Sequence, residues 1–328
     1  MLGKTLWGAA VLLVLGTGSS FAASLPATTE NVVILAQDSV TLGGRSQLNS
    51  GQIAVNNAGG VLTVRYGVHA LDNTEIIADI VSVKAPLSRK AELFDVLANS
   101  FLGGDRAIVD GAVVSPLGAS LPLFEPFPSA PVVTPGTDPC PNRTGSGGNC
   151  VVRREDGAVT LPPGDYGKII AKGQGVLYLQ GGVYNIKSLS VGLSSFIIVN
   201  GSATVNVQKD VSFGPGSTFG PANDINPRCV VLNVAGEHVR VSVATVSAVI
   251  NAPNATVSLG ANTQFKGAMY TGNLVGKKVR VGAFSTLQSP DPLCEPCEKG
   301  GRPCTPMATV TPTPTGTPTP TPPALGEV

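Results

Sequence analysis

Short strings of alternating apolar and polar residues recur along this chain about every 20 residues, and this repeat constrains the fold most strongly. The strings at Val239, Val257 and Val279 follow one another at that interval, and Val40 and Val81 lie about two intervals apart. In each string the first and third residues are apolar and the middle one is polar, as in Val257-Ser258-Leu259. Successive side chains of a strand therefore point inward and outward in turn.

A coil of about 20 residues cannot bury its own apolar side chains, but stacked coils can bury them against one another. Glycines that follow the strings supply the corners: Gly43, Gly192, Gly260 and Gly282. The repeat predicts an all-β fold, a right-handed parallel β-helix (a solenoid of about 20 residues per coil). An antiparallel β-sandwich is the alternative, because it also produces short alternating strands between glycine turns.

The solenoid pattern is interrupted, and the interruptions divide the chain. Apolar residues from Leu87 to Phe101 recur at spacings of four and three, which predicts one helix alongside the solenoid, ended by Gly103 and Gly104. The predicted units are an N-terminal solenoid part (23–86), the inserted helix (87–104), a connection with a Pro-rich stretch and a Cys loop (105–157), the main solenoid (158–290), a Cys-rich tail (291–308) and a Thr/Pro stalk (309–328).

The N-terminus has the pattern of a cleavable signal peptide, assigned to residues 1–22. Lys4 precedes the apolar run 6–16, and Ser20 and Ala22 occupy the small-residue positions before the predicted cleavage site. The run is too short to span a bilayer, and no later segment is apolar for long enough. We therefore expect a secreted or cell-surface protein without a transmembrane segment in the mature chain.

Six cysteines fit an oxidising compartment: Cys140, Cys150, Cys229, Cys294, Cys297 and Cys304. Cys140 and Cys150 flank a short polar loop and are the simplest pair to join. The alternative for the other four is a four-sulfur zinc site.

Several strings resemble those of secreted bacterial cell-envelope β-solenoid proteins: LPPGDY at 161–166, LYLQGGVY at 177–184 and APNATVSLG at 252–260. More distantly, the opening NVVILAQDSVTLGG at 31–44 is similar to that of ice-binding and adhesin-type β-solenoids. The resemblance implies an extracellular structural or adhesive role and supplies no catalytic residues.

Candidate catalytic residues are few. The chain has 22 basic and 21 acidic residues, a balance that excludes a strongly basic nucleic-acid binder. The predicted outward positions carry no carboxylate: Thr41, Ser82, Ser190, Asn206, Arg240, Ser258 and Arg280. Glu237, His238 and Arg240 are the weak catalytic candidates. Two isolated histidines do not make a zinc site, and no cofactor motif is found.

These observations favour a non-enzymatic structural or adhesive β-solenoid that binds cell-envelope or matrix components or a surface polymer. One alternative is a polysaccharide lyase or hydrolase, in which Glu237, His238 and Arg240 would meet acids of a neighbouring coil in a cleft. The other is an ice- or surface-binding module, which requires a flat, charge-free face. Arg240 and Arg280, among the outward positions, argue against that alternative.

Overall fold

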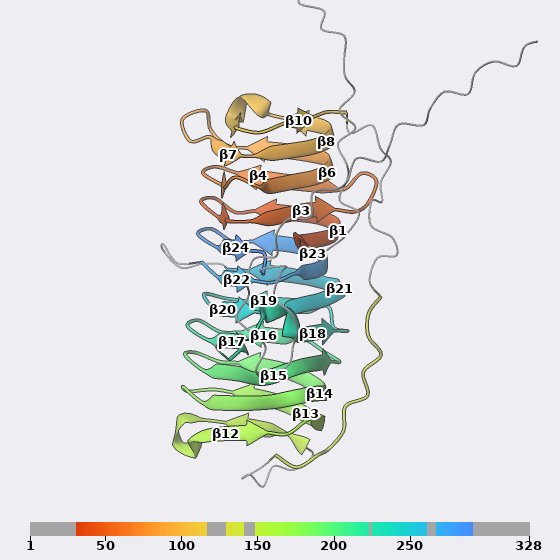
Figure 1. The fold of residues 1–328 in the computed structure, drawn as a ribbon, viewed down its shortest axis with the longest axis vertical. Helices are drawn as coiled ribbons and strands as arrows, with labels where there is room; N and C mark the ends of the chain where they lie inside the picture. The colour runs from red at the N-terminus through yellow and green to blue at the C-terminus, as the bar shows by residue number, and fades with distance from the viewer. Residues whose placement is uncertain (1–30, 117–128, 141–147, 223–224, 261–266, 291–328) are drawn as a thin grey trace, which may run out of the picture.

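The computed structural model describes residues 31–116, 129–140, 148–222, 225–260 and 267–290, and these form one parallel β-solenoid (Figure 1). It has about 11 turns of about 21 residues each. At about 4.8 Å per step the stack is roughly 50 Å long. The predicted signal peptide, the residues after 290 with the stalk, and Cys294, Cys297 and Cys304 lie outside the described residues.

Each full coil contributes strands to three faces, and a long strand can bend from one face to the next. Face 1 and then face 2 are crossed by β1 (Val32–Leu42), β6 (Thr74–Lys84), β8 (Asp95–Leu102), β13 (Gly164–Ala171), β21 (Val249–Leu259) and β23 (Leu274–Val281). Face 1 alone holds β3 (Gly51–Val55), β10 (Val113–Val114) and β18 (Val230–Val234). Face 2 alone holds β4 (Val61–Arg65), β11 (Cys150–Val152), β16 (Val211–Phe213) and β19 (His238–Val241).

Face 3 is built mainly from short strands. They are β2 (Gln47–Leu48), β5 (His69–Ala70), β7 (Ala91–Leu93), β9 (Ala107–Val109), β12 (Ala158–Leu161), β17 (Thr218–Pro221), β20 (Thr245–Ser247), β22 (Met269–Thr271) and β24 (Thr286–Gln288). Two longer strands start on face 3 and turn into face 1: β14 (Val176–Val191), which also reaches face 2, and β15 (Phe196–Val207). The short 3-10 turns are η1 (Gly104–Arg106), η3 (Arg154–Asp156) and η4 (Pro227–Cys229).

The coils are not stacked in the order of the chain. β1 pairs with β3 and β4 on one side and with β23 on the other, so the first strand lies in the middle of the stack. In Figure 1 the blue coils of β23 and β24 therefore lie directly beside the red coil of β1. The chain winds from β1 to one end at β10, resumes at the opposite end with β11 and β12, and returns to the middle.

The predicted alternation of inward and outward side chains is confirmed. Val257 and Leu259 are fully buried, whereas Ser258 between them is partly exposed. The same pattern holds on β1, where Val40 and Leu42 are buried around Thr41. Val, Ile and Leu therefore fill the narrow interior, as the repeat predicts.

The close stacking of the corners explains why glycines follow the strands. A Cβ on Gly43 would lie 2.6 Å from the carbonyl carbon of Gly282, its neighbour in the next coil. Gly260 instead needs glycine for its backbone, because its φ is +67°.

The helix predicted over 87–104 is wrong. Within these residues the chain forms β7, most of which is buried, and β8, which pairs in parallel with β6. The spacings of four and three arise because two short alternating strands are separated by a corner. An apolar stripe on a helix and two alternating strands joined by a corner give the same spacing of apolar residues in the sequence. Pairing with the strands of the neighbouring coil favours the strands.

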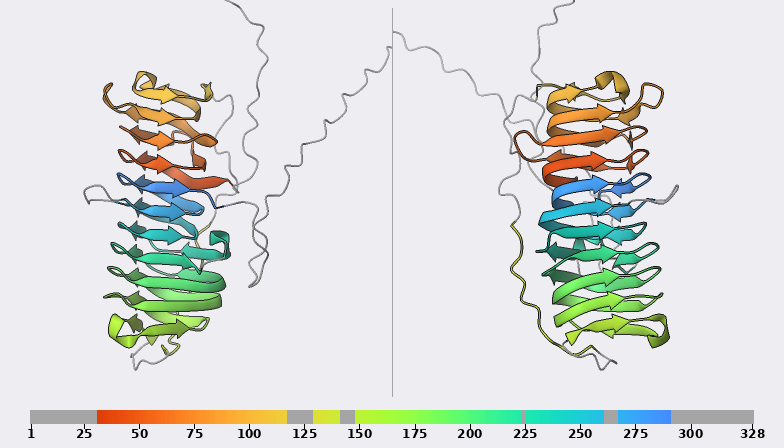
Figure 2. Two further views of the ribbon diagram at one scale, coloured as in Figure 1. Left: turned by 60° about the vertical axis from the view of Figure 1, so that its left-hand side comes forward. Right: turned by 180° about the vertical axis from the view of Figure 1, so that it is seen from behind.

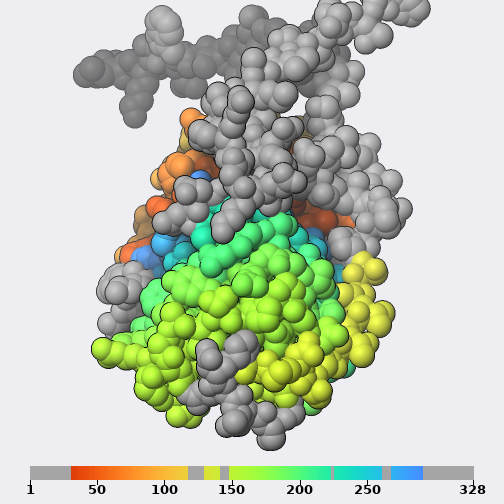
Figure 3. Space-filling model, turned by 60° about the horizontal axis from the view of Figure 1, so that its bottom comes forward, coloured from red at the N-terminus to blue at the C-terminus, as the bar shows by residue number. Residues whose placement is uncertain are grey.

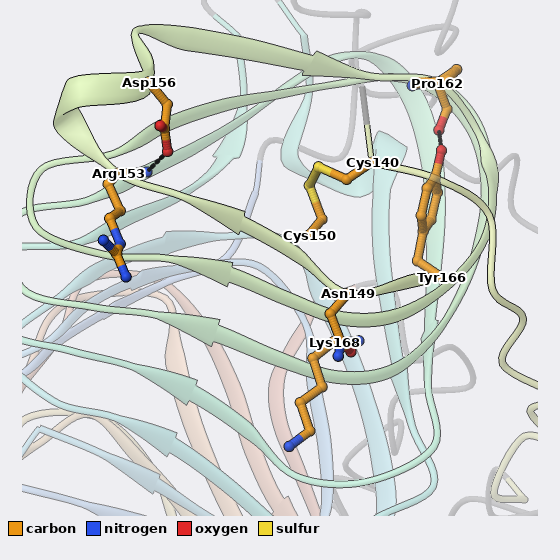
Figure 4. The surroundings of a disulfide bond; sticks show 8 residues. All are labelled: Cys140, Asn149, Cys150, Arg153, Asp156, Pro162, Tyr166 and Lys168. Atoms are coloured by element: carbon orange, nitrogen blue, oxygen red, sulfur yellow. Dashed lines mark hydrogen bonds between the residues drawn. A yellow bond between two sulfur atoms is a disulfide. The ribbon is translucent and has the colours of Figure 1, made fainter. Parts of the chain in front are cut away.

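The end coil that contains β11 is fastened to residues 129–140, which run along the outside of the stack (Figure 2). Cys140 forms a disulfide with Cys150 at the start of β11 (Figure 4). The Asp138 carboxylate accepts a hydrogen bond of 2.7 Å from the Asp165 N–H, and the Asp138 N–H donates one of 2.8 Å to the Asp165 carbonyl. In Figure 3 this segment, in yellow, lies against the green end coils.

Cys229 at the end of η4 is buried and disulfide-bonded. A disulfide removes the free thiolate that a zinc site would need, so Cys229 cannot contribute to the four-sulfur alternative.

A ladder of side-chain amides runs along the outside of face 1. The Nδ2 of each asparagine donates to the Oδ1 of the residue one coil nearer β13: Asn251 to Asn233 (3.0 Å), Asn233 to Asn206 (2.9 Å), Asn206 to Asn185 (2.9 Å) and Asn185 to the Asp165 carboxylate (2.7 Å). Beyond Asn251 the same column becomes aliphatic, with Val275, Leu35, Ala54, Ile77 and Leu97. We refer to the five hydrogen-bonded side chains as the amide ladder.

Candidate functional site

Face 3 carries no charged side chain at its outward strand positions over seven consecutive coils, from β12 to β24. Each strand offers two such positions, and the coils stack in parallel. The residues are Ala158, Thr160, Val176, Tyr178, Phe196, Ile198, Thr218, Gly220, Thr245, Ser247, Met269, Thr271, Thr286 and Gln288. We call this set the neutral surface.

The neutral surface is regular. Its strands pair residue for residue, with no register shift along this face. Outward side chains therefore recur about every 4.8 Å along the stack and about every 7 Å along each strand. Five of the positions are threonines, each of which places a methyl and a hydroxyl group on the surface: Thr160, Thr218, Thr245, Thr271 and Thr286. The result is an uncharged array in which threonines are interspersed with larger side chains, and Phe196 and Met269 are its exposed large apolar side chains.

Charged side chains occur on face 3 beyond β24, where the neutral surface ends. After β24 the outward column continues through Gln47 to His69 and Glu92, and the His69 Nε2 lies 3.0 Å from a carboxylate oxygen of Glu92. At the corner beside β24, the Arg45 guanidinium lies 5.4 Å from the centre of the Phe284 ring. The neutral surface is thus confined to the coils formed by residues 158–288.

The outward residues predicted from sequence lie mainly on another face. Six of them fall in one column of face 2, in the order Ser82, Thr41, Arg280, Ser258, Arg240 and Ser190, while Asn206 lies on face 1. The charges that argued against an ice-binding face therefore belong to face 2. Sequence reasoning missed the neutral surface because β17, β20, β22 and β24 are only three or four residues long and show no repeated string.

Glu237 and His238 line a groove of about 580 Å³ at the corner between faces 1 and 2. The groove brings them together with Lys277 and Lys278 of β23, and Gln37, Ala235, Asn254 and Thr256 complete its lining. Arg240 lies two residues beyond His238 on β19, at an outward position.

Acids do not converge on these candidates as the enzyme alternative requires. Glu237 is the one carboxylate among the described residues that line the groove. Asp210, one coil away, uses its carboxylate to accept the backbone N–H of His238 at 3.1 Å. The arrangement therefore offers cations around a single acid, whereas hydrolysis of a glycosidic bond ordinarily needs a carboxylate pair.

A second groove of about 580 Å³ holds a carboxylate pair that sequence reasoning missed. Glu75 and Asp95 are register partners on β6 and β8, and both line the groove. Burial and the neighbouring Asp95 carboxylate raise the pKa of Glu75, although Gln52 donates a 2.6 Å hydrogen bond to it. Asp95 accepts a 2.7 Å hydrogen bond from the Ala112 N–H. The two acids belong to strings on neighbouring coils, so only the register of the stack identifies them as a pair.

Within the described ranges, no three His, Cys, Asp or Glu side chains gather closely enough to hold a metal ion. The same ranges contain no helix with the length and apolar character needed to cross a membrane.

No protein-family model matches the chain, and no curated protein matches it in sequence. Two solved structures are similar at low levels. One is the ice-binding protein of the Antarctic ascomycete Antarctomyces psychrotrophicus, with 13% identity and a TM-score of 0.30 over 79% of this chain and 95% of that one. The other is an ice-binding protein from an Antarctic bacterium of the Flavobacteriaceae, with 12% identity and a TM-score of 0.21 over 82% and 81%. TM-scores this low assign neither fold nor function to this chain.

Proposed function

We propose that this protein is a non-enzymatic surface-binding module that adsorbs to ice through the neutral surface. One observation carries the proposal: two outward positions on each of seven consecutive strands are free of charge and held in constant register. Export and a location outside the cell remain predictions from the N-terminal pattern, and they are consistent with binding to an extracellular surface.

The chemistry of the neutral surface suits an uncharged, ordered partner. Charged groups hold their hydration water strongly, so a charged face would resist losing that water to a lattice. Threonine methyl groups favour leaving bulk water, while their hydroxyl groups can donate and accept hydrogen bonds. Because the array is fixed by the backbone ladders, binding to a rigid surface costs little conformational entropy.

The geometry favours a flat solid over a soluble small ligand. Ligand pockets are concave and enclose most of their ligand. The neutral surface instead extends over seven coils, about 30 Å along the stack. A flat lattice can contact all of these coils at once, so many weak contacts add together.

The test is adsorption to ice by Thr245→Lys, which places a charge in the middle of the neutral surface. We expect this variant to lose thermal hysteresis and incorporation into a growing ice hemisphere. Ser258→Lys is the matched control, because it makes a similar change at an outward strand position of face 2 and should retain both activities. Circular dichroism must show an intact fold in both variants. Full ice adsorption by a folded Thr245→Lys protein would refute the proposal.

A second candidate is a carbohydrate-active enzyme, favoured by the carboxylate pair Glu75 and Asp95. A carboxyl group whose pKa is raised, as that of Glu75 is, beside a second carboxylate is the pattern expected of a general acid beside a nucleophile or base. Incubation with plant and bacterial polysaccharides should then release sugars or unsaturated products, and Glu75→Gln should abolish that release. Absence of any product from the wild-type protein would leave ice adsorption as the better proposal.

A further inference from the structure

We propose that face 2 carries a second binding site, for a linear acidic polysaccharide, made by the outward residues of β19, β21 and β23. The residues are His238 and Arg240 on β19, Thr256 and Ser258 on β21, and Lys278 and Arg280 on β23. We call these six residues, together with Lys277, the cationic patch. It lies on a different face from the neutral surface.

The register places these residues in two rows. His238, Thr256 and Lys278 stack in one column, and Arg240, Ser258 and Arg280 stack in the next. Arg240 and Arg280 are therefore two coil steps apart, about 10 Å, with a hydroxyl group between them. The rows are separated by about 7 Å along each strand. This gives a regular array of cations and hydroxyl groups along the stack axis.

The cations are available to a ligand. Arg240, Lys277, Lys278 and Arg280 are exposed, and within the described ranges none of them forms an ion pair. Glu237 directly precedes His238 on the same coil. Asp210 on one neighbouring coil accepts a hydrogen bond from the backbone of His238, and Asp38, which precedes Ser39, the register partner of Lys278, accepts one from Asn57. In a chain with 22 basic and 21 acidic residues, this concentration of cations reflects segregation of charge onto one face.

A groove borders the cationic patch and adds a recessed surface to the proposed site. It measures about 580 Å³, and its lining includes His238, Thr256, Lys277 and Lys278. Asn254 and Gln37 add side-chain amides that can bind hydroxyl groups. A polymer that follows the columns can thus meet cations on the outward positions and amides at the corner.

The chemistry selects the class of polymer. Lysine and arginine bind carboxylate or sulfate groups through charge-assisted hydrogen bonds, and the serine and threonine hydroxyl groups between them match sugar hydroxyl groups. Single-stranded nucleic acids are usually held by aromatic side chains on which the bases stack. The cationic patch and the groove lining contain no Phe, Tyr or Trp, and the imidazole of His238 is their one ring that could stack on a base. A neutral glycan would leave the cations without partners.

The experiment is fluorescence anisotropy with labelled polygalacturonate as probe, and with neutral dextran and a single-stranded DNA of equal charge for comparison. Lys278→Gln with Arg280→Gln is the test variant. Arg65→Gln with Lys84→Gln is the matched control, because these two exposed residues are register neighbours in the other half of the stack. Each pair removes the same charge.

We expect polygalacturonate binding to weaken at least about tenfold in the test variant and less than about twofold in the control, with affinity falling as salt rises. Thr245→Lys should bind polygalacturonate normally, so loss of ice adsorption and loss of glycan binding are separable. The proposal fails if the wild-type protein binds polygalacturonate no better than dextran. It also fails if both double variants weaken binding equally, or if DNA binds more tightly than polygalacturonate.

Discussion

The amide ladder predicts a specific pattern of coupling between asparagines. Asn206→Ala removes two side-chain hydrogen bonds, one donated to Asn185 and one accepted from Asn233, each 2.9 Å long. At about 1 kcal/mol of net stability per bond, and with water able to reach the half-buried partners, the loss should be about 1–3 kcal/mol. Asn233→Ala should cost a similar amount, because it also removes two ladder bonds.

The two substitutions share one hydrogen bond. The double variant therefore loses three bonds, while the sum of the two single variants counts four. We expect the double variant to be more stable than additivity predicts by about 0.5–1.5 kcal/mol, the contribution of one bond. Asn185→Ala with Asn251→Ala is the control pair, because these residues share no bond and their effects should add.

The assay is urea unfolding followed by far-ultraviolet circular dichroism, with all variants measured side by side. Thr204→Val provides a further control, because it changes the other outward position of face 1 on β15 and should shift stability by less than about 0.5 kcal/mol. Strict additivity for Asn206 and Asn233, or coupling of equal size in the control pair, would refute the ladder as a connected network.

Three further predictions concern the interior and the grooves. Val257→Asp should destabilise the fold by more than about 3 kcal/mol, because the side chain at position 257 is fully buried. Ser258→Asp is the control and should be tolerated, because Ser258 points outward. Unchanged thermal melting of Val257→Asp would contradict the inward orientation of Val257. Tyr184→Phe should lower the free energy of unfolding in urea by about 1–3 kcal/mol. The buried Tyr184 hydroxyl lies 2.8 Å from the Leu161 carbonyl oxygen and 2.9 Å from that of Gln180, and it donates a hydrogen bond to one of them. Tyr178→Phe on the neutral surface is the control. The pKa of Glu75 is raised in the folded protein, so ionised Glu75 opposes folding and its cost grows as pH rises through the folded pKa. Glu75→Gln should therefore stabilise the protein at pH 7 but not at pH 3. If the substitution changed the free energy of unfolding by the same amount at both pH values, the raised pKa of Glu75 would be contradicted.

The local architecture could be predicted from the sequence because each string carries its own evidence. Alternation on β21 identifies Val257 and Leu259 as interior, and the interval of two coils between Val40 and Val81 matches their positions in the stack. A pattern of this kind depends only on neighbours along the chain.

Long-range features could not be predicted in the same way. The pairing of β1 with β23 joins residues more than 200 positions apart, and no local string encodes it. The carboxylate pair and the cationic patch depend on the same register, since Glu75 meets Asp95, and Arg240 is aligned with Arg280, only through stacking. The neutral surface could not be recognised in the sequence because most of its strands are too short to show a repeated pattern. The helix was predicted wrongly because two strands joined by a corner have apolar residues at the spacing of a helix.

The position of β1 in the middle of the stack makes this chain a circular permutation of a simple spiral. A chain that began at β11, ran to β24, continued into β1 and ended at β10 would place every coil next to its sequence neighbour. In the natural order, the described chain enters at Asn31 and leaves at Pro290, both beside the central seam. Any tether joined at either point would hold the rod at this seam, with seven coils on one side and four on the other, so the rod could lie lengthwise and present a whole side to a surface.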